Sequence, residues 1–133
     1  MIEVVVSRLG LDSSTQSYVV ILQEKDGQWT RAKGFDTFCP LGPWVSDEVD
    51  PAAGLIIEAR VNGELRQQGT TADFIFTIPE LLIYITAAIT LETGDIVLTG
   101  TPSGVGPLAA GDQVTVAAPG LGVLVNSVAA EHS

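Results

Sequence analysis

The chain has 133 residues, a length that suits one domain built around a single hydrophobic core. Its formal charge is −10, with 16 acidic residues against 6 basic ones, so its surface repels phosphate backbones and no nucleic-acid partner is expected. Apolar residues make up 46%, which excludes a disordered chain, and the longest apolar stretch, residues 81–91, is too short to span a bilayer.

The cellular compartment is predicted from two features of the chain. A single cysteine, Cys39, excludes an internal disulfide framework and is compatible with a reducing environment. The first residues lack the basic start and the small-residue cleavage site of a signal peptide. We therefore expect a cytoplasmic protein with no membrane partner. Cys39 itself, between Phe38 and Pro40, is interpreted as a small buried hydrophobic residue and not as a nucleophile.

The first third of the chain predicts short strands followed by a loop. Residues 2–8, 18–22 and 28–31 are rich in β-branched and aromatic residues and are predicted as strands. Asp26-Gly27 precedes the third of them and is typical of a hairpin turn. Prolines and acidic residues between 38 and 51 predict an ordered loop.

A second hairpin is predicted in the middle of the chain. Residues 55–61 form a strand pattern, Asn62-Gly63 is the strongest hairpin signal in the sequence, and residues 64–68 form the returning strand. These three features together predict an antiparallel pair with a two-residue turn.

One helix is predicted, starting at Thr77. Thr77 and Glu80 have the spacing of a capping box, and Pro79 lies in the first turn, where its missing N–H is not needed. Gly94 is expected to end the helix in a left-handed conformation. The predicted apolar face consists of Leu81, Leu82, Ile85, Ala88 and Ile89.

After the helix, the pattern returns to β structure. The predicted elements are a strand at 95–99, a Gly- and Pro-rich loop at 100–106, strands at 113–117 and 122–128 joined through Pro119-Gly120, and a frayed tail at 129–133. The fold class that follows is mainly β with one central helix.

Three ordered segments carry a family resemblance. They read RAKGFDTFCPLGPW, then VNGELRQQGTTADFIFTIPELLIYITAAITLETGDIVLTGTPSGVGPL, then GDQVTVAAPGLGVLVNSV. Residues 28–128 resemble the C-terminal catalytic region of the fumarylacetoacetate hydrolase family. The resemblance implies a β-roll, an open mixed barrel-like sheet. It also implies metal-dependent C–C hydrolysis, decarboxylation or tautomerisation of 1,3-dicarbonyl acids.

The resemblance assigns roles to three residues. It implies that Lys33 is the catalytic lysine beside metal and substrate, and that Thr101 and Gln23 contact the substrate. The residues alone leave other interpretations open. Lys33 is equally explained as an exposed lysine pairing with Asp36, Thr101 as part of a turn that needs small residues, and Gln23 as a polar residue at a strand end.

The metal carboxylates of the family are missing from this sequence. The family's Glu-x-Glu pair does not occur in the chain, and Gln16 and Val20 stand where the resemblance expects an aspartate ligand and an arginine. We therefore expect no metal ligands and no cofactor. Mg²⁺ or Mn²⁺ would bind only at a rebuilt site that uses Asp36, Glu58 or Asp73 near the lysine and threonine.

The N-terminal segment resembles a different family. The motifs MIEVVV, LDSSTQS and VVIL in residues 1–25 are similar to the opening hairpin of the bifunctional nuclease family. We hypothesise that the chain is a single-domain chimera with an N-terminal hairpin at 1–27, a truncated hydrolase core at 28–128 and a tail at 129–133. The hairpin is expected to complete the barrel by pairing with its open edge.

Three functions follow from these observations. The first is a folded family scaffold that has lost its metal site and most of its activity. The second is an active metal-dependent acylpyruvate-type hydrolase with a rebuilt site. The third is a structural module that self-associates, since a partial β-roll leaves apolar surface exposed. We expect a dimer or higher oligomer in each case, and a small dicarbonyl acid as ligand if the chain is active.

Overall fold

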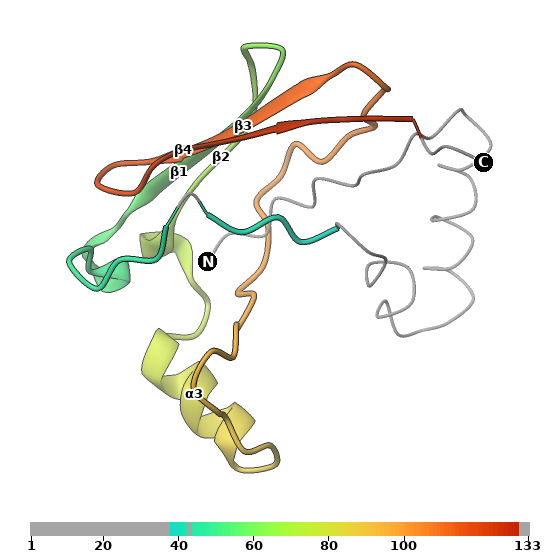
Figure 1. The fold of residues 1–133 in the computed structure, drawn as a ribbon. Helices are drawn as coiled ribbons and strands as arrows, with labels where there is room; N and C mark the ends of the chain where they lie inside the picture. Colours follow the sequence, from blue (N-terminus) through green and yellow to red (C-terminus); the bar gives the residue numbers. More distant parts are fainter. Residues whose placement is uncertain (1–37, 43, 131–133) are drawn as a thin grey trace.

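The computed structural model describes residues 38–42 and 44–130, which form a four-stranded antiparallel sheet and an α-helix that lies apart from it (Figure 1). The sheet has the order β2-β1-β3-β4. The elements in chain order are η1 (Pro51–Ala53), β1 (Ile56–Val61), β2 (Glu64–Thr70), η2 (Thr71–Asp73), α3 (Ile78–Thr86), β3 (Gln113–Ala118) and β4 (Gly122–Ser127).

The turn between β1 and β2 is the predicted two-residue hairpin turn. Asn62 and Gly63 have φ angles of 51° and 82°, as a turn with two left-handed residues requires. The Asn62 side chain accepts the N–H of Gln113 at 2.9 Å and donates to the Asp112 carboxylate at 2.8 Å. The hairpin is therefore tied to the start of β3 by one side chain.

A β-bulge interrupts the pairing of β1 with β2. Ala59 lies opposite Gln67, while the next residue, Arg60, lies opposite Leu65, so Arg66 is an extra residue on β2. A bulge bends its strand and changes the direction of local backbone groups. The sequence pattern predicted the two strands and did not predict this irregularity.

The two faces of the sheet have different environments. One face carries Ala59, 4% exposed, and Val114, 2% exposed, and Val114 forms the small core with Val128. Val61 and Leu108 pack against this core while staying half-buried. The opposite face carries exposed side chains, including Val123 and Val125 of β4. Side-chain alternation along each strand produces this division.

The strand predicted at 95–99 is not a strand in the structure. These residues carry no regular secondary structure and belong to the segment that returns from α3 to β3 (Figure 1). A strand exists only where a neighbouring strand completes its hydrogen-bond ladder, and the described sheet consists of β1 to β4 alone. An apolar, β-branched run was therefore insufficient to predict a strand here.

The start of the helix is confirmed, and its predicted end is wrong. The Thr77 hydroxyl accepts the Glu80 N–H, and the Glu80 carboxylate accepts the Thr77 N–H at 2.7 Å, which completes the capping box. The helix nevertheless ends at Thr86, whose hydroxyl donates to the Leu82 carbonyl at 2.8 Å. Gly94 is left-handed as expected, with φ 101°, but it lies in a separate later turn.

The helix lies between β2 and β3 in the chain and apart from the sheet in space. Figure 1 shows α3 standing away from the sheet, and its side chains are largely exposed. Leu81 and Ile85 are half-buried, whereas Ile83 and Tyr84 are 71% and 82% exposed. The amphipathic pattern predicted a helix correctly, but within the described residues no sheet face covers it.

The β-rich character of the predicted fold is confirmed, and completion of a barrel is not. The described sheet is antiparallel throughout, so no mixed sheet is seen in this part of the chain. The hairpin predicted to complete the barrel, at 1–27, lies outside the described residues. Its ancestry and the single-domain organisation stay predictions. Within the described ranges, no helix has the length and apolar character needed to cross a membrane.

Candidate functional site

The 100–106 loop, predicted to contact substrate, is fastened to β2 by one side chain. The Gln67 side-chain amide donates from Nε2 to the Thr101 hydroxyl oxygen at 3.0 Å and to the Pro102 carbonyl at 2.8 Å. Gln67 is half-buried and Thr101 is exposed. The loop therefore presents the Thr101 side chain to solvent from a backbone that a glutamine of the sheet holds in place.

A second contact holds the same loop against the bulge of β2. Gly104 has a φ of 101°, and a Cβ added there would overlap the carbonyl oxygen of Arg66. Any larger residue at Gly104 would have to move either the loop or the bulged strand. The glycine is thus required for close approach of two backbones as well as for its left-handed conformation.

The three predicted site residues are not all described. Thr101 lies in the loop and bonds Gln67 as stated above. Lys33 and Gln23 lie outside the described residues, so their roles stay predictions. Sequence reasoning missed Gln67. Its signal was a polar side chain directly opposite the buried Ala59, at a position where alternation places it on the core face.

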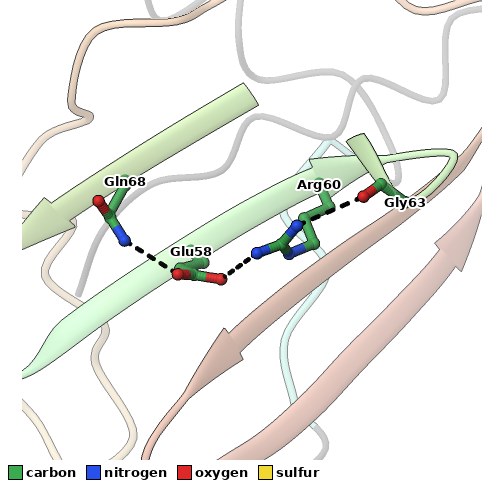
Figure 2. Close-up of polar contacts among 4 residues, drawn as sticks. All are labelled: Glu58, Arg60, Gly63 and Gln68. Carbon is green, nitrogen blue, oxygen red and sulfur yellow. Dashed lines mark hydrogen bonds and ion pairs between the residues drawn. The ribbon is translucent and has the colours of Figure 1, made fainter. Parts of the chain in front are cut away.

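Glu58, considered as a replacement metal ligand, is engaged by other side chains. Figure 2 shows its carboxylate between Gln68 and Arg60, with hydrogen bonds of 2.9 Å and 2.8 Å to its two oxygens. Arg60 also donates to the carbonyl of Gly63 at 3.4 Å. The hydrogen bond from Arg60, with smaller help from its charge and from Gln68, holds the pKa of Glu58 below its ordinary value despite opposing desolvation.

Glu58 also lies on the wrong face for a site at Thr101. It pairs with Gln68 across the β1–β2 ladder, whereas Gln67, which holds Thr101, pairs with Ala59 on the core face. Neighbouring strand positions project to opposite faces of a sheet. A site that joins Glu58 to Thr101 is therefore incompatible with this register.

The described residues do not by themselves fit a divalent metal. Mg²⁺ and Mn²⁺ take several hard oxygen ligands, and the described ranges contain no group of three His, Cys, Asp or Glu side chains placed to hold an ion. Asp73 lies exposed in η2, and Asp36 is outside the described residues. The predicted Thr101 site is thus a hydrogen-bonding site in the part of the chain that is described.

Cys39 corrects another expectation. It was predicted to be buried, but the structure shows a free, exposed thiol, while the adjacent Phe38 is 6% exposed. Of these two neighbouring residues, only Phe38 is buried. The two side chains lie in a bend of the chain, which places Phe38 inward and Cys39 outward.

Comparisons with known proteins identify relatives for most of the chain. A model of the family described as fumarylacetoacetate (FAA) hydrolase, C-terminal, matches residues 9–129. That range begins inside the segment predicted to have another ancestry, so the chimera hypothesis is unconfirmed. An uncharacterised protein of Methanocaldococcus jannaschii is 53% identical over 111 residues, which cover 84% of this chain and 46% of that relative.

Solved structures show the same similarity. A 5-carboxymethyl-2-hydroxymuconate delta-isomerase from Mycobacterium smegmatis superposes with a TM-score of 0.81 at 45% identity, covering 86% of this chain and 45% of that one. A maleylpyruvate hydrolase from Sphingobium sp. SYK-6, in complex with manganese(II) and pyruvate, has a TM-score of 0.73 at 38% identity, covering 80% and 40%. This chain thus spans less than half the length of these relatives.

Proposed function

Since the chain belongs to the fumarylacetoacetate hydrolase family, we propose that it is a substrate-binding scaffold with little or no turnover of its own. Named family members among the relatives act on dicarbonyl acids as isomerases, decarboxylases, tautomerases and hydrolases. In the proposal, the 100–106 loop binds the carboxylate of such an acid through the hydroxyl of Thr101, and the catalytic metal site of the family is incomplete.

One observation supports the binding half of this proposal. The loop that carries Thr101 is held by two hydrogen bonds from Gln67, and Gly104 lies against the backbone of β2. A loop held in one conformation before the ligand arrives loses less conformational entropy on binding. The pyruvate complex of the related maleylpyruvate hydrolase makes a 2-oxo acid a reasonable ligand to test.

The chemistry of the available side chains supports the other half. A Lewis-acid reaction on a dicarbonyl acid needs a divalent ion with several carboxylate ligands. The sequence has no Glu-x-Glu pair, and the two oxygens of Glu58 are occupied by Arg60 and Gln68. A chain that binds the acid without fixing the ion is expected to leave the substrate unreacted.

A turnover assay tests the proposal. The 133-residue chain is incubated with acylpyruvate, and separately with oxaloacetate, in Mn²⁺, in Mg²⁺ or in EDTA. Each rate is compared with a blank that contains the metal alone. We expect rates equal to the blank. Metal-dependent turnover above the blank, abolished by Lys33→Ala, would reject the scaffold in favour of an active enzyme with a rebuilt site.

We also propose that the chain self-associates, with a second copy covering exposed apolar side chains around α3. Ile75 and Phe76, just before the helix, are 92% and 60% exposed, and Ile83 and Tyr84 within it are 71% and 82% exposed. Large apolar side chains gathered on the surface can mark an interaction site, and these four lie within ten residues of one another in the sequence. Light scattering over a hundredfold range of concentration tests this, and a constant monomer mass would reject it.

A further inference from the structure

We infer that Gln67 is a positioning residue that fixes the Thr101 hydroxyl as a hydrogen-bond donor to a carboxylate. This inference rests on the proposed function, in which Thr101 makes the carboxylate contact. It adds a directional requirement: the proton of the Thr101 hydroxyl must point away from β2, and Gln67 is the residue that ensures it.

The hydrogen-bonding chemistry of Pro102 determines how the Gln67 amide is oriented. The carbonyl oxygen of Pro102 can only accept, so the Gln67 atom that faces it at 2.8 Å must be the NH₂ nitrogen. The same nitrogen lies 3.0 Å from the Thr101 hydroxyl oxygen. An amide NH₂ has two hydrogens, and these two contacts use both of them.

It follows that Thr101 accepts a hydrogen bond from Gln67 and cannot donate one back to that nitrogen. The hydroxyl proton is therefore directed elsewhere, and within the described residues the Thr101 hydroxyl donates to no acceptor. Thr101 is exposed, so this proton is available to a ligand. A carboxylate, which only accepts hydrogen bonds, is the ligand group that matches an outward-directed hydroxyl proton.

A simpler role for Gln67 would be to fasten the loop without setting the direction of any proton. Two substitutions separate these roles. In Gln67→Glu the side chain keeps its length, but its carboxylate accepts the Thr101 proton and turns it inward, away from the ligand. In Gln67→Met the length is similar and both donors are lost, so the Thr101 hydroxyl is free to rotate.

Gln68 provides a matched control on the opposite face of the sheet. It is the next residue along β2, and it bonds Glu58, not the loop. Gln68→Glu adds the same charge as Gln67→Glu close by, so any general electrostatic effect of the added charge on an anionic ligand appears in both variants. The two variants then differ in the effects that pass through the loop, at the Thr101 hydroxyl and at the Pro102 carbonyl, and Gln67→Met measures the loss of both donors without the charge.

The experiment is a titration of the ¹⁵N-labelled full chain with sodium pyruvate, followed by the backbone amide signals of residues 100–106. We expect about tenfold to a hundredfold weaker binding for Gln67→Glu and Thr101→Ala, the loss typical of a hydrogen bond to a charged group. We expect roughly threefold to tenfold weaker binding for Gln67→Met, because it loses one neutral hydrogen bond's worth of orientation. Gln68→Glu should bind as the unsubstituted chain does.

A ligand-free signal tests the geometry independently. Without ligand, Thr101→Ala should shift one of the two Gln67 side-chain amide protons, relative to the unsubstituted chain, much more than the other, because only one of them is bonded to the hydroxyl. Melting curves of each variant show whether the fold is kept. If Gln67→Glu fails to fold, the comparison is made with Gln67→Met.

The outcomes distinguish this inference from the proposed function. Suppose that the unsubstituted chain binds pyruvate. Equal affinity of Gln67→Glu and Gln68→Glu would then overturn the role of Gln67, and so would equal affinity of Gln67→Met and the unsubstituted chain. Either result would leave the proposed function standing. Absence of pyruvate binding to the unsubstituted chain would overturn the proposed function, and the inference with it.

Discussion

Gly104 lies so close to the carbonyl oxygen of Arg66 that no side chain fits between the loop and the bulged strand. Arg66 is the extra residue of the β1–β2 ladder, so the irregularity of the strand and the glycine of the loop meet at one point. Two adjacent residues of β2 therefore hold the 100–106 loop: Arg66 through this contact and Gln67 through its hydrogen bonds.

Gly104→Ala is expected to destabilise the fold by about 3 kcal/mol, from steric overlap with Arg66 and from a left-handed φ that alanine disfavours. The measurement is the free energy of unfolding in urea. Gly106→Ala is the matched control in the same loop, because an added Cβ there meets nothing within 4 Å. Equal stability of the two variants would contradict the close contact.

Asn62→Ala is expected to lower the free energy of unfolding by about 3 kcal/mol. The substitution removes the hydrogen bonds to Asp112 and Gln113 and places alanine at a φ of 51°. Asn62→Gly removes the same hydrogen bonds without the backbone penalty and should cost about 1 to 2 kcal/mol. Urea denaturation compares the variants, and a glycine variant no more stable than the alanine variant would argue against the left-handed turn.

The melting temperature is expected to fall as the pH decreases below the ordinary pKa of an aspartate, 3.8. The Ala109 N–H, followed by the Asn62 side chain, lowers the pKa of Asp112 in the folded chain. A group with a depressed folded pKa contributes stability above its unfolded pKa and loses that contribution as pH falls through the folded pKa.

The test of this pH dependence compares melting temperatures between about pH 3 and pH 7 for the unsubstituted chain, Asp112→Asn and Asp47→Asn. The difference between the unsubstituted chain and Asp112→Asn should shrink on acidification. Asp47, an exposed loop residue, serves as the control. Some pH dependence will stay in every variant, because the pKa values of Glu58 and Glu80 are also lowered. A difference that is constant with pH would contradict the role of Asp112.

Ile83→Glu is expected to reduce the apparent molecular mass of the chain in solution, because a charge in an apolar contact between copies is strongly unfavourable. Val45→Glu is the control: it adds the same charge at a side chain that is 98% exposed and far from α3 in sequence. Size-exclusion chromatography with light scattering measures the mass. An equal effect of both substitutions would indicate that α3 is not the contact surface.

Features that depend on adjacent residues were predicted correctly from the sequence. The Asn62-Gly63 turn follows from the backbone preferences of two residues, and the helix start follows from the Thr77 and Glu80 capping box. The capping box forms hydrogen bonds between residues three positions apart, and the turn depends on the left-handed backbone preference of two adjacent residues. Neither prediction required knowledge of contacts with distant parts of the chain.

Features that depend on distant partners were not predictable in the same way. The run at 95–99 has strand composition, but strand formation needs a neighbouring ladder that local sequence does not reveal. Gln67 bonds a threonine 34 positions later, and a polar residue at a core-face position of β2 does not by itself identify that partner. The end of α3 at Thr86 also differs from the prediction, and there the Thr86 hydroxyl donates to the Leu82 carbonyl, a contact that the apolar periodicity does not reveal.

The most direct test of the account is a thermal melt of the full chain in EDTA, in millimolar Mg²⁺ and in millimolar Mn²⁺. A scaffold without a complete metal site predicts the same melting temperature in all three. An ion that bound only the folded chain at a hundred times its dissociation constant would add about 2.7 kcal/mol, a rise of roughly 10 °C for a domain of this size. Such a metal-dependent rise would contradict the scaffold and establish a working cation site.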